Sequence, residues 1–187
     1  MPLFLILHNI RSLHNVGSMF RTADAAGVDK IYLTGYTPSP YDFFGKLRRD
    51  FAKTALGAEK FVPWEQKKSI GVLINELKDT SPPKVFVVSL EQSPHAIPYN
   101  KLTTIYHSKL KKYSGVALIV GNEVRGISPT ILKKSDAVIE IPIHGLMVRQ
   151  AHHPKGLKIG KESLNVAVAV GIALFSLREQ FGRWRSK

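Results

Sequence analysis

The sequence predicts an α/β fold built on a mainly parallel sheet flanked by helices. Short apolar runs alternate with segments of helical periodicity along the whole chain, which is the pattern of repeated βα units. The apolar runs are continuous, as expected for strands that are buried on both faces. With 187 residues, of which 44% are hydrophobic, the chain is expected to form a single domain with a substantial core.

Five apolar runs, rich in β-branched residues and bounded by turn residues, are expected to be strands. They are Leu3–Leu7, Lys30–Thr34, Lys84–Leu90, Val116–Val120 and Ala137–Ile141.

Three helices are expected between and after these strands. The first covers Asn15–Ala26, with Asn15 as its N-cap and Gly27 at its end. The second, Ser69–Lys78, carries one apolar face, and the third runs from Ser163 to about Phe181. The segment Gly35–Asp50, which contains aromatic residues and two prolines, is expected to be an ordered loop.

The charge balance favours a polyanionic partner. Lys and Arg number 27 against 14 Asp and Glu, a formal net charge of +13, which favours nucleic acid over an anionic membrane. The alternative is a basic protein that repulsion keeps soluble. There is no cysteine, which excludes disulfides, Cys-based metal sites and a thiol nucleophile. No leader or membrane span is expected, so the protein is expected in the cytoplasm, without a metal or a membrane partner.

The glycine pattern excludes two common nucleotide-binding motifs. None of the 14 glycines lies two positions from another, so the Gly-x-Gly of a dinucleotide fingerprint is absent. The segment Gly121–Gly126 has the first spacing of a P-loop, but Ile127 and Ser128 follow in place of its Lys and Ser/Thr. A turn with two glycines, a carboxylate and a guanidinium after a buried strand indicates either a ligand site or a strand-to-helix turn whose Glu123–Arg125 pair is solvated.

Three segments together resemble the SPOUT superfamily of RNA methyltransferases, in its TrmH (SpoU) family of 2′-O-ribose methyltransferases. The first is Asn15-Val-Gly-Ser-Met-Phe-Arg21, and the second is Gly121-Asn-Glu123-Val-Arg-Gly126. The third is Ile141-Pro-Ile-His-Gly145 followed by Ser163-Leu-Asn165. Their order and distances match the family over nearly the whole chain.

The resemblance implies a Rossmann-like SPOUT fold with a C-terminal deep trefoil knot, a homodimer, and S-adenosylmethionine as the cofactor. The implied activity is methylation of a ribose 2′-OH in tRNA or rRNA. The alternative is a catalytically impaired RNA-binding protein on the same fold. The implied catalytic residues are Arg21, Asn15, Glu123, Ser163 and Asn165. The implied cofactor-binding residues are Leu90, Gly121, Asn122, Gly126, Ile141, Ser163 and Leu164.

Arg21 has two interpretations. The resemblance places it nearest the 2′-OH, but a guanidinium stays protonated near neutral pH, so it is a poor general base and is better suited to positioning the hydroxyl or a phosphate. The alternative is an ion pair with Asp24 on the surface of the helix.

RNA contacts are expected from Arg21 and from the cations Lys46, Arg48 and Arg49. Two further cationic groups are Lys109, Lys111 and Lys112, and the C-terminal Arg178, Arg183, Arg185 and Lys187. The aromatics around the first group are expected either to stack on an unpaired base or to anchor their loop; they are Tyr36, Tyr41, Phe43 and Phe44.

The chain departs from the family pattern between Gly145 and Ser163, where only a few residues are expected. Residues 146–160 therefore look like a 15-residue basic insertion in the knot loop of a single 1–187 methyltransferase domain without a separate RNA-binding domain. Three consequences stay open: the insertion loops out, extends the RNA-binding surface, or blocks the cofactor site.

Overall fold

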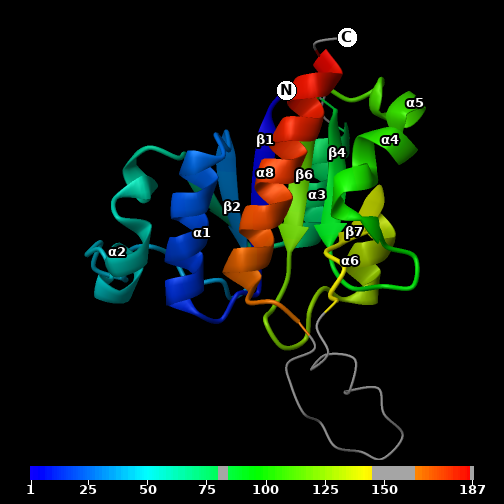
Figure 1. Ribbon diagram of the computed structural model, residues 1–187. Coiled ribbons are helices and arrows are strands. Elements are labelled where there is room, and N and C mark those ends of the chain that lie inside the picture. The colour runs from blue at the N-terminus through cyan, green and yellow to red at the C-terminus, as the bar shows by residue number, and fades with distance from the viewer. Residues whose placement is uncertain (80–83, 145–162, 186–187) are drawn as a thin grey trace, which may run out of the picture.

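Seven parallel strands form the centre of the structure (Figure 1). The computed structural model describes residues 1–79, 84–144 and 163–185, and the side chains as far as Gly182. The strands are β1 (Leu3–His8), β2 (Lys30–Thr34), β3 (Trp64–Lys67), β4 (Val85–Leu90), β5 (Ile97–Pro98), β6 (Gly115–Val120) and β7 (Ala137–Glu140). The α-helices are α1 (Leu13–Ala25), α2 (Arg49–Ala55), α3 (Ile70–Asp79), α4 (Leu102–Ile105), α5 (His107–Leu110), α6 (Pro129–Lys134) and α8 (Val166–Arg185).

The strand order is β3-β2-β1-β6-β4-β7-β5, and every pairing is parallel. Residue Leu5 of β1 lies opposite Ile31 on one side and opposite Leu118 on the other. The carboxyl ends of the strands therefore meet at one end of the sheet, which is the lower end in Figure 1. The predicted α/β class with a parallel sheet is confirmed.

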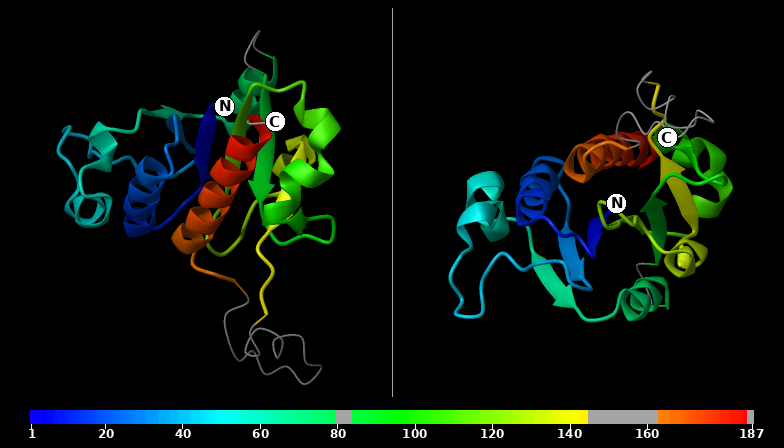
Figure 2. Two further views of the ribbon diagram at one scale, coloured as in Figure 1. Left: turned by 45° about the horizontal axis from the view of Figure 1, so that its top comes forward. Right: turned by 90° about the horizontal axis from the view of Figure 1, so that it is seen from below.

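Helices cover both faces of the sheet, as the end-on view in Figure 2 shows. Leu5 and Leu7 of β1 pack in the larger core, to which α1, α2, α4, α5 and α8 contribute. Ile6 points to the opposite face and packs in a second core with α3 and α6. This alternation explains why the strand sequence is apolar at every position.

Helix α1 begins two residues earlier than expected. The Ser12 side chain accepts a hydrogen bond from the Asn15 N–H at 3.3 Å, so Ser12 is the N-cap and the prediction of Asn15 in that role is wrong. The side chain of Asn15 is thereby available for another partner. Gly27 lies just past the end of the helix with φ +65°, as a C-terminal glycine requires.

The elements missed from the sequence are short or lie at the edges. Strands β3 and β5 are the two outer strands; β3 is half-exposed and polar, and β5 has two residues. The predicted loop Gly35–Asp50 ends inside α2, which begins at Arg49. Helices α4, α5 and α6 have four to six residues each, too few for a clear helical period.

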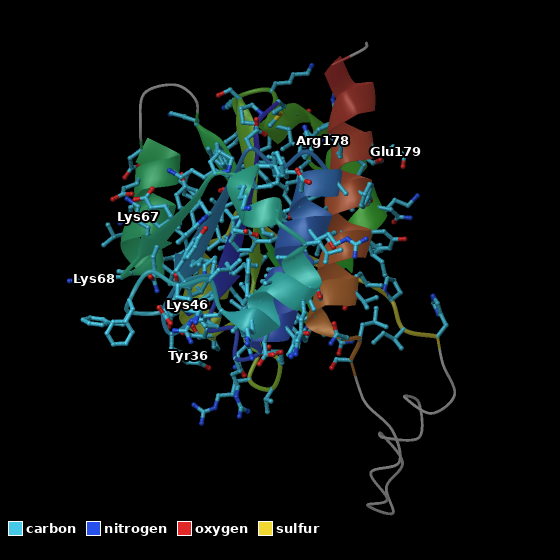
Figure 3. The ribbon with its side chains drawn as sticks, turned by 90° about the vertical axis from the view of Figure 1, so that its left-hand side faces the viewer. Tyr36, Lys46, Lys67, Lys68, Arg178 and Glu179 are labelled. Carbon is cyan, nitrogen blue, oxygen red and sulfur yellow. The ribbon has the colours of Figure 1, made fainter. Side chains whose placement is uncertain are left out.

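Arg178 joins α8 to the end of α1. Its guanidinium donates to the carbonyls of Ala26 (2.9 Å), Met1 (3.4 Å) and Gly27, and lies 3.8 Å from the Asp29 carboxylate. Figure 3 shows Arg178 at the upper end, away from the carboxyl ends of the strands. The sequence predicts Arg178 as an RNA-binding cation. In the structure, its guanidinium instead donates its hydrogen bonds to backbone carbonyls of the same chain. The side chains of Arg183, Arg185 and Lys187 lie outside the described residues.

Candidate active site

Glu123 lies between β6 and α6 and closes the amino end of α1. Its carboxylate accepts hydrogen bonds from the backbone N–H groups of Arg11 (2.9 Å) and Ser12 (3.1 Å) and from the side-chain amide of Asn15 (3.0 Å). An anion at this place also suits the positive end of the helix. The sequence separation of more than 100 residues is bridged because β1 and β6 are neighbours in the sheet.

These hydrogen bonds keep Glu123 ionised. Partial burial raises the pKa of its carboxyl group, but the donors from the Arg11 backbone, the Asn15 side chain and the Ser12 backbone outweigh that effect. The pKa of Glu123 is consequently lowered from its ordinary value. A carboxylate in this state only accepts, and so fixes the orientation of the Asn15 amide.

Asn15 also forms a hydrogen bond with a residue at the start of α8. Its side-chain oxygen accepts a hydrogen bond from the side-chain amide of Asn165 at 3.3 Å. The Asn165 oxygen in turn accepts from the N–H groups of Ala167 (2.9 Å) and Val168 (3.4 Å), which makes Asn165 the cap of α8. Glu123, Asn15 and Asn165 thus form one hydrogen-bonded chain with a fixed direction.

Asn122 holds the turn that presents Glu123. It is 7% exposed, and its amide donates to the carbonyl of Asn9 (3.0 Å) and to the hydroxyl of Tyr36 (2.9 Å). Its side-chain oxygen accepts from the N–H groups of Val124 and Arg125 at 2.9 and 2.8 Å. Because these contacts occupy both ends of the amide, Asn122 shapes the turn rather than offering free polar atoms to a ligand.

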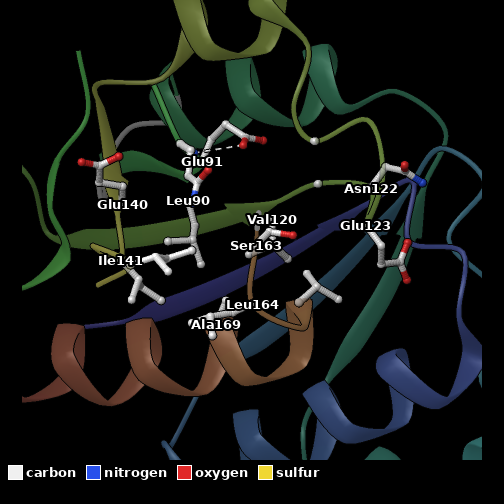
Figure 4. Close-up of a pocket in the computed structure, with 15 residues that line it drawn as sticks. Leu90, Glu91, Val120, Asn122, Glu123, Glu140, Ile141, Ser163, Leu164 and Ala169 are labelled. Atoms are coloured by element: carbon white, nitrogen blue, oxygen red, sulfur yellow. Dashed lines mark hydrogen bonds between the residues drawn. The ribbon is translucent and has the colours of Figure 1, made fainter. Parts of the chain in front are cut away.

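A pocket opens at the carboxyl ends of β4, β6 and β7 (Figure 4). All seven residues assigned to the cofactor by the resemblance line it: Leu90, Gly121, Asn122, Gly126, Ile141, Ser163 and Leu164. Glu123 lines it too, so the hydrogen-bonded chain reaches the pocket wall. Apolar side chains from three strand ends and from the start of α8 make up much of the lining.

Two glycines make the pocket turn possible. A side chain at Gly121 would come within 2.7 Å of the Gly126 backbone. At Gly126, with φ +64°, it would collide with the Glu91 carboxylate, which accepts a hydrogen bond from the Ile127 N–H at 2.7 Å. Glu91 and Glu140 line the same pocket and were not predicted. Each lies at the carboxyl end of an expected strand, a position that could have indicated them.

The sequence matches the SpoU rRNA Methylase family over residues 2–149. The chain belongs to this family. Over 179 residues it is 30% identical to the 23S rRNA (guanosine-2′-O-)-methyltransferase RlmB of Haemophilus ducreyi, a match that covers 96% of this chain and 60% of RlmB. Over 174 residues it is 31% identical to the 23S rRNA (guanosine(2553)-2′-O)-methyltransferase RlmP of Bacillus subtilis, covering 93% of this chain and 57% of RlmP. The chain therefore spans about three fifths of the length of these relatives.

A solved structure agrees with the fold. The SpoU methyltransferase AviRb of Streptomyces viridochromogenes, in complex with the cofactor AdoMet, superimposes with a TM-score of 0.74 at 20% identity. The match covers 97% of this chain and 61% of AviRb. At this identity, the comparison shows that the two share a fold.

Among the predicted catalytic residues of this SpoU chain, Arg21 lies apart from the others. It borders a separate hollow between α1, α2 and α8, together with Ser18, Lys53 and Phe175. Its side chain is exposed and makes no hydrogen bond or ion pair within the described part of the chain, so the alternative pairing with Asp24 is not seen. The structure therefore brings Asn15, Glu123 and Asn165 together, with Ser163 in the adjoining pocket, and leaves Arg21 outside.

Of the other predicted RNA-binding cations, Lys46 and Arg48 lie in the loop after β2 and Arg49 begins α2. Lys46, Arg48 and Arg49 are exposed. Arg48 donates from Nε to the Tyr41 carbonyl at 3.3 Å, and none of the three forms an ion pair with any other described residue. Lys109, in the second cationic group, lies 3.7 Å from the Asp136 carboxylate.

Residues 146–160, including the basic Arg149, His152, His153, Lys155 and Lys158, lie outside the described residues. Across the described ranges, no helix is long and apolar enough to cross a membrane. The same ranges hold no group of three or more His, Cys, Asp or Glu residues placed to bind a metal ion.

Proposed function

We propose that this SpoU family member is an S-adenosylmethionine-dependent RNA 2′-O-ribose methyltransferase that acts on rRNA or tRNA in the cytoplasm. The observation that carries the proposal is the hydrogen-bonded chain Glu123–Asn15–Asn165 at the edge of the pocket. Each of the three sequence motifs supplies one of its side chains. The names of RlmB and RlmP support RNA ribose as the substrate class.

The pocket fits the methyl donor. Leu90, Ile141 and Leu164 provide apolar surface suited to an adenine ring, and the glycine turn allows close backbone approach. The carboxylates of Glu91 and Glu140 border the same space and favour a positively charged ligand. When bound, S-adenosylmethionine supplies a methyl group that its sulfonium centre has already activated, and AviRb was solved with this cofactor.

On the side of the ribose acceptor, the protein side chains orient the reacting groups and form no covalent bond with them. Asn15 holds one amide hydrogen of Asn165, which leaves the second directed to a ribose or to the donor. Ser163 adds a hydroxyl in the pocket. Aligning the hydroxyl with the methyl group is the main contribution that such a displacement needs, and the hydroxyl proton leaves to solvent.

We assign Arg21 to the active site of a partner subunit in a homodimer. Within one protomer Arg21 does not reach the pocket. Phe175, which borders the same hollow, and Val168 expose apolar surface, and their spacing of seven residues places them on one face of α8. Covering this face with a second copy would bury the stripe and carry Arg21 toward the partner's pocket, where its guanidinium would bind the 2′-OH or a neighbouring phosphate.

We further propose that the chain between Ile141 and Asn165 closes the deep trefoil knot and that residues 146–160 are an insertion in its loop. The resemblance implies knot loops at Leu90–Glu91, Gly121–Gly126 and Ile141–Asn165. Leu90, Gly121 and Ile141, one from each loop, line the same pocket. The alternative of a catalytically impaired RNA-binding protein is not supported, because the motif side chains are present and hydrogen-bonded to one another.

A methyl-transfer assay tests the proposal. The protein is incubated with labelled S-adenosylmethionine and with RNA from cells that lack it. We expect label in ribose 2′-O-methyl groups of 23S rRNA or tRNA, located by nucleotide-resolution mapping. The matched variant Asn165→Ser keeps a capping oxygen but removes the amide, so it should bind RNA yet transfer little label. Donor binding by calorimetry without transfer to any cellular RNA would overturn the proposed substrate, and absence of donor binding would overturn the activity.

A further inference from the structure

Two neighbouring phenylalanines stand in solvent at the tip of the loop between β2 and α2. Phe43 is 96% exposed and Phe44 is 89% exposed. Their rings pack only edge to face on each other, with centroids 5.6 Å apart. Single exposed apolar residues are ordinary, but an adjacent aromatic pair rimmed by polar residues marks a binding surface.

The tip is rigidly built. The Asp42 carboxylate accepts hydrogen bonds from the N–H groups of Phe44 and Lys46, both at 2.9 Å. The Asp42 N–H donates to the Lys46 carbonyl at 2.9 Å, and Gly45 completes the turn with φ +74°. A preorganised turn spends little conformational entropy when it binds a ligand.

The other two aromatics of the loop anchor it. Tyr41 bridges to Leu47 and stacks on Trp64 of β3, with ring centroids 6.2 Å apart and planes 20° apart. The hydroxyl of Tyr36 accepts the amide hydrogen of Asn122. The loop therefore uses two of its aromatic rings for its own structure and leaves Phe43 and Phe44 without such a role.

Three cations follow the tip in the sequence. Lys46, Arg48 and Arg49 are exposed, and within the described residues none of them forms an ion pair. Asp42, the acidic residue among residues 41–49, has its side chain occupied by the turn. Flat rings next to positive charges are complementary to a base and its flanking phosphates.

The loop lies at the same end of the sheet as the pocket. It follows the carboxyl end of β2, and Tyr36 links it to Asn122 in the pocket turn. Figure 3 shows Tyr36 and Lys46 together at this end. RNA held at the tip would thus approach the pocket from the side of β2.

We propose that Phe43 and Phe44 form a stacking platform for an unpaired base of the RNA, while Lys46, Arg48 and Arg49 bind the flanking phosphates. This inference rests on the proposed function only in taking RNA as the substrate. It deepens that function by naming the substrate class: single-stranded RNA, such as a loop, in preference to a duplex. Duplex bases are already stacked and present no free face.

Binding of a single-stranded oligoribonucleotide containing 2-aminopurine, and of its duplex, tests the platform. The double variant Phe43→Ala/Phe44→Ala should bind the single strand about 5- to 150-fold more weakly than wild type, the range expected for the loss of one stacked base. The fluorescence of 2-aminopurine should be quenched by wild type and not by the variant. Phe61→Ala is the control, because Phe61 is also exposed (75%) but lies near the amino end of β3.

Salt dependence separates stacking from charge. The double variant should keep the wild-type slope of log affinity against log salt, whereas Lys46→Ala should reduce that slope by about one. Equal binding of single strand and duplex, or an unchanged affinity of the double variant, would overturn the platform. A change in the oligomeric state of the double variant, measured by light scattering, would also overturn the platform, because it would assign the tip to an interface between copies of the chain. Because these readouts need no methyl transfer, they hold or fail independently of the proposed activity.

Discussion

The side-chain amide of Asn15 donates a hydrogen bond of 3.0 Å to the carboxylate of Glu123, across 108 positions of sequence. The contact exists because β1 and β6 are adjacent, so the residues that follow both strands meet at one end of the sheet. It joins the first and second motifs directly, and Asn165 adds the third through Asn15. The three motifs therefore form one physical unit.

Glu123→Gln tests the charge in this unit. The carboxylate accepts three hydrogen bonds, and the replacement amide can repeat only part of that pattern, so we expect a loss of about 1 kcal/mol in the free energy of unfolding at neutral pH. The folded-state pKa of Glu123 is lowered from 4.5, so its contribution is present above pH 4.5 and is lost as the pH falls through the folded value.

The measurement is denaturant unfolding of wild type and Glu123→Gln between pH 7 and acid. The difference between the two should be largest at neutral pH and should shrink below about pH 4.5. A difference that does not change with pH would mean that the contribution of Glu123 does not depend on its charge.

The pocket turn gives a second prediction. At Gly121 an added methyl group would press on the Gly126 backbone, which cannot move without shifting the Asn122 contacts. Gly121→Ala should therefore lower the free energy of unfolding by about 1–3 kcal/mol and abolish measurable donor binding by calorimetry.

Gly182→Ala is the matched control for this variant. Gly182 lies in α8, and a methyl group there would meet nothing within 4 Å. It should leave donor binding intact and raise stability by up to about 1 kcal/mol. Donor binding by Gly121→Ala at wild-type strength would show that the turn does not contact the donor.

Much of this arrangement could be predicted from the sequence, and the reasons are specific. The strands β4, β6 and β7 were expected as apolar runs, and their carboxyl ends locate the pocket; all seven expected cofactor residues line it. The hydrogen bonds that Asn122 donates to Asn9, just after β1, and to Tyr36, just after β2, were not predictable. They depend on strand order, which local periodicity does not encode.

Arg21 marks the other limit of prediction. The resemblance placed it in the active site, yet its side chain lies outside the pocket and borders the hollow beside Phe175. A motif identifies residues that act together, but not which copy of the chain supplies each one.

Tyr36→Phe tests the link between the β2 loop and the pocket turn. Removing the hydroxyl leaves the buried Asn122 amide with one acceptor fewer, which should cost about 1 kcal/mol of stability. We expect weaker donor binding by calorimetry while the phenyl ring, and any contact it makes with RNA, is retained. Tyr41→Phe is the control, since its stacking on Trp64 uses the ring alone and should leave both quantities unchanged. Equal donor affinity in the two variants would show that the contact between Tyr36 and Asn122 does not affect donor binding.

Complementation between two inactive variants tests the assignment of Arg21 to the partner subunit. Arg21→Ala should keep the dimer and lose methyl transfer, and Asn165→Ser should lose transfer at the other side of the same composite site. In a mixed dimer one site receives both substitutions and the other receives neither. With random mixing, half of the dimers are mixed and each has one intact site, so about a quarter of wild-type activity should return.

The readout is methyl transfer after subunits of the two variants are exchanged, with each variant alone as the baseline. If Arg21 acted in its own protomer, both sites of a mixed dimer would carry one substitution, and mixing would restore nothing. The experiment therefore distinguishes the two placements by the presence or absence of recovery, and it does so without knowledge of which nucleotide is modified.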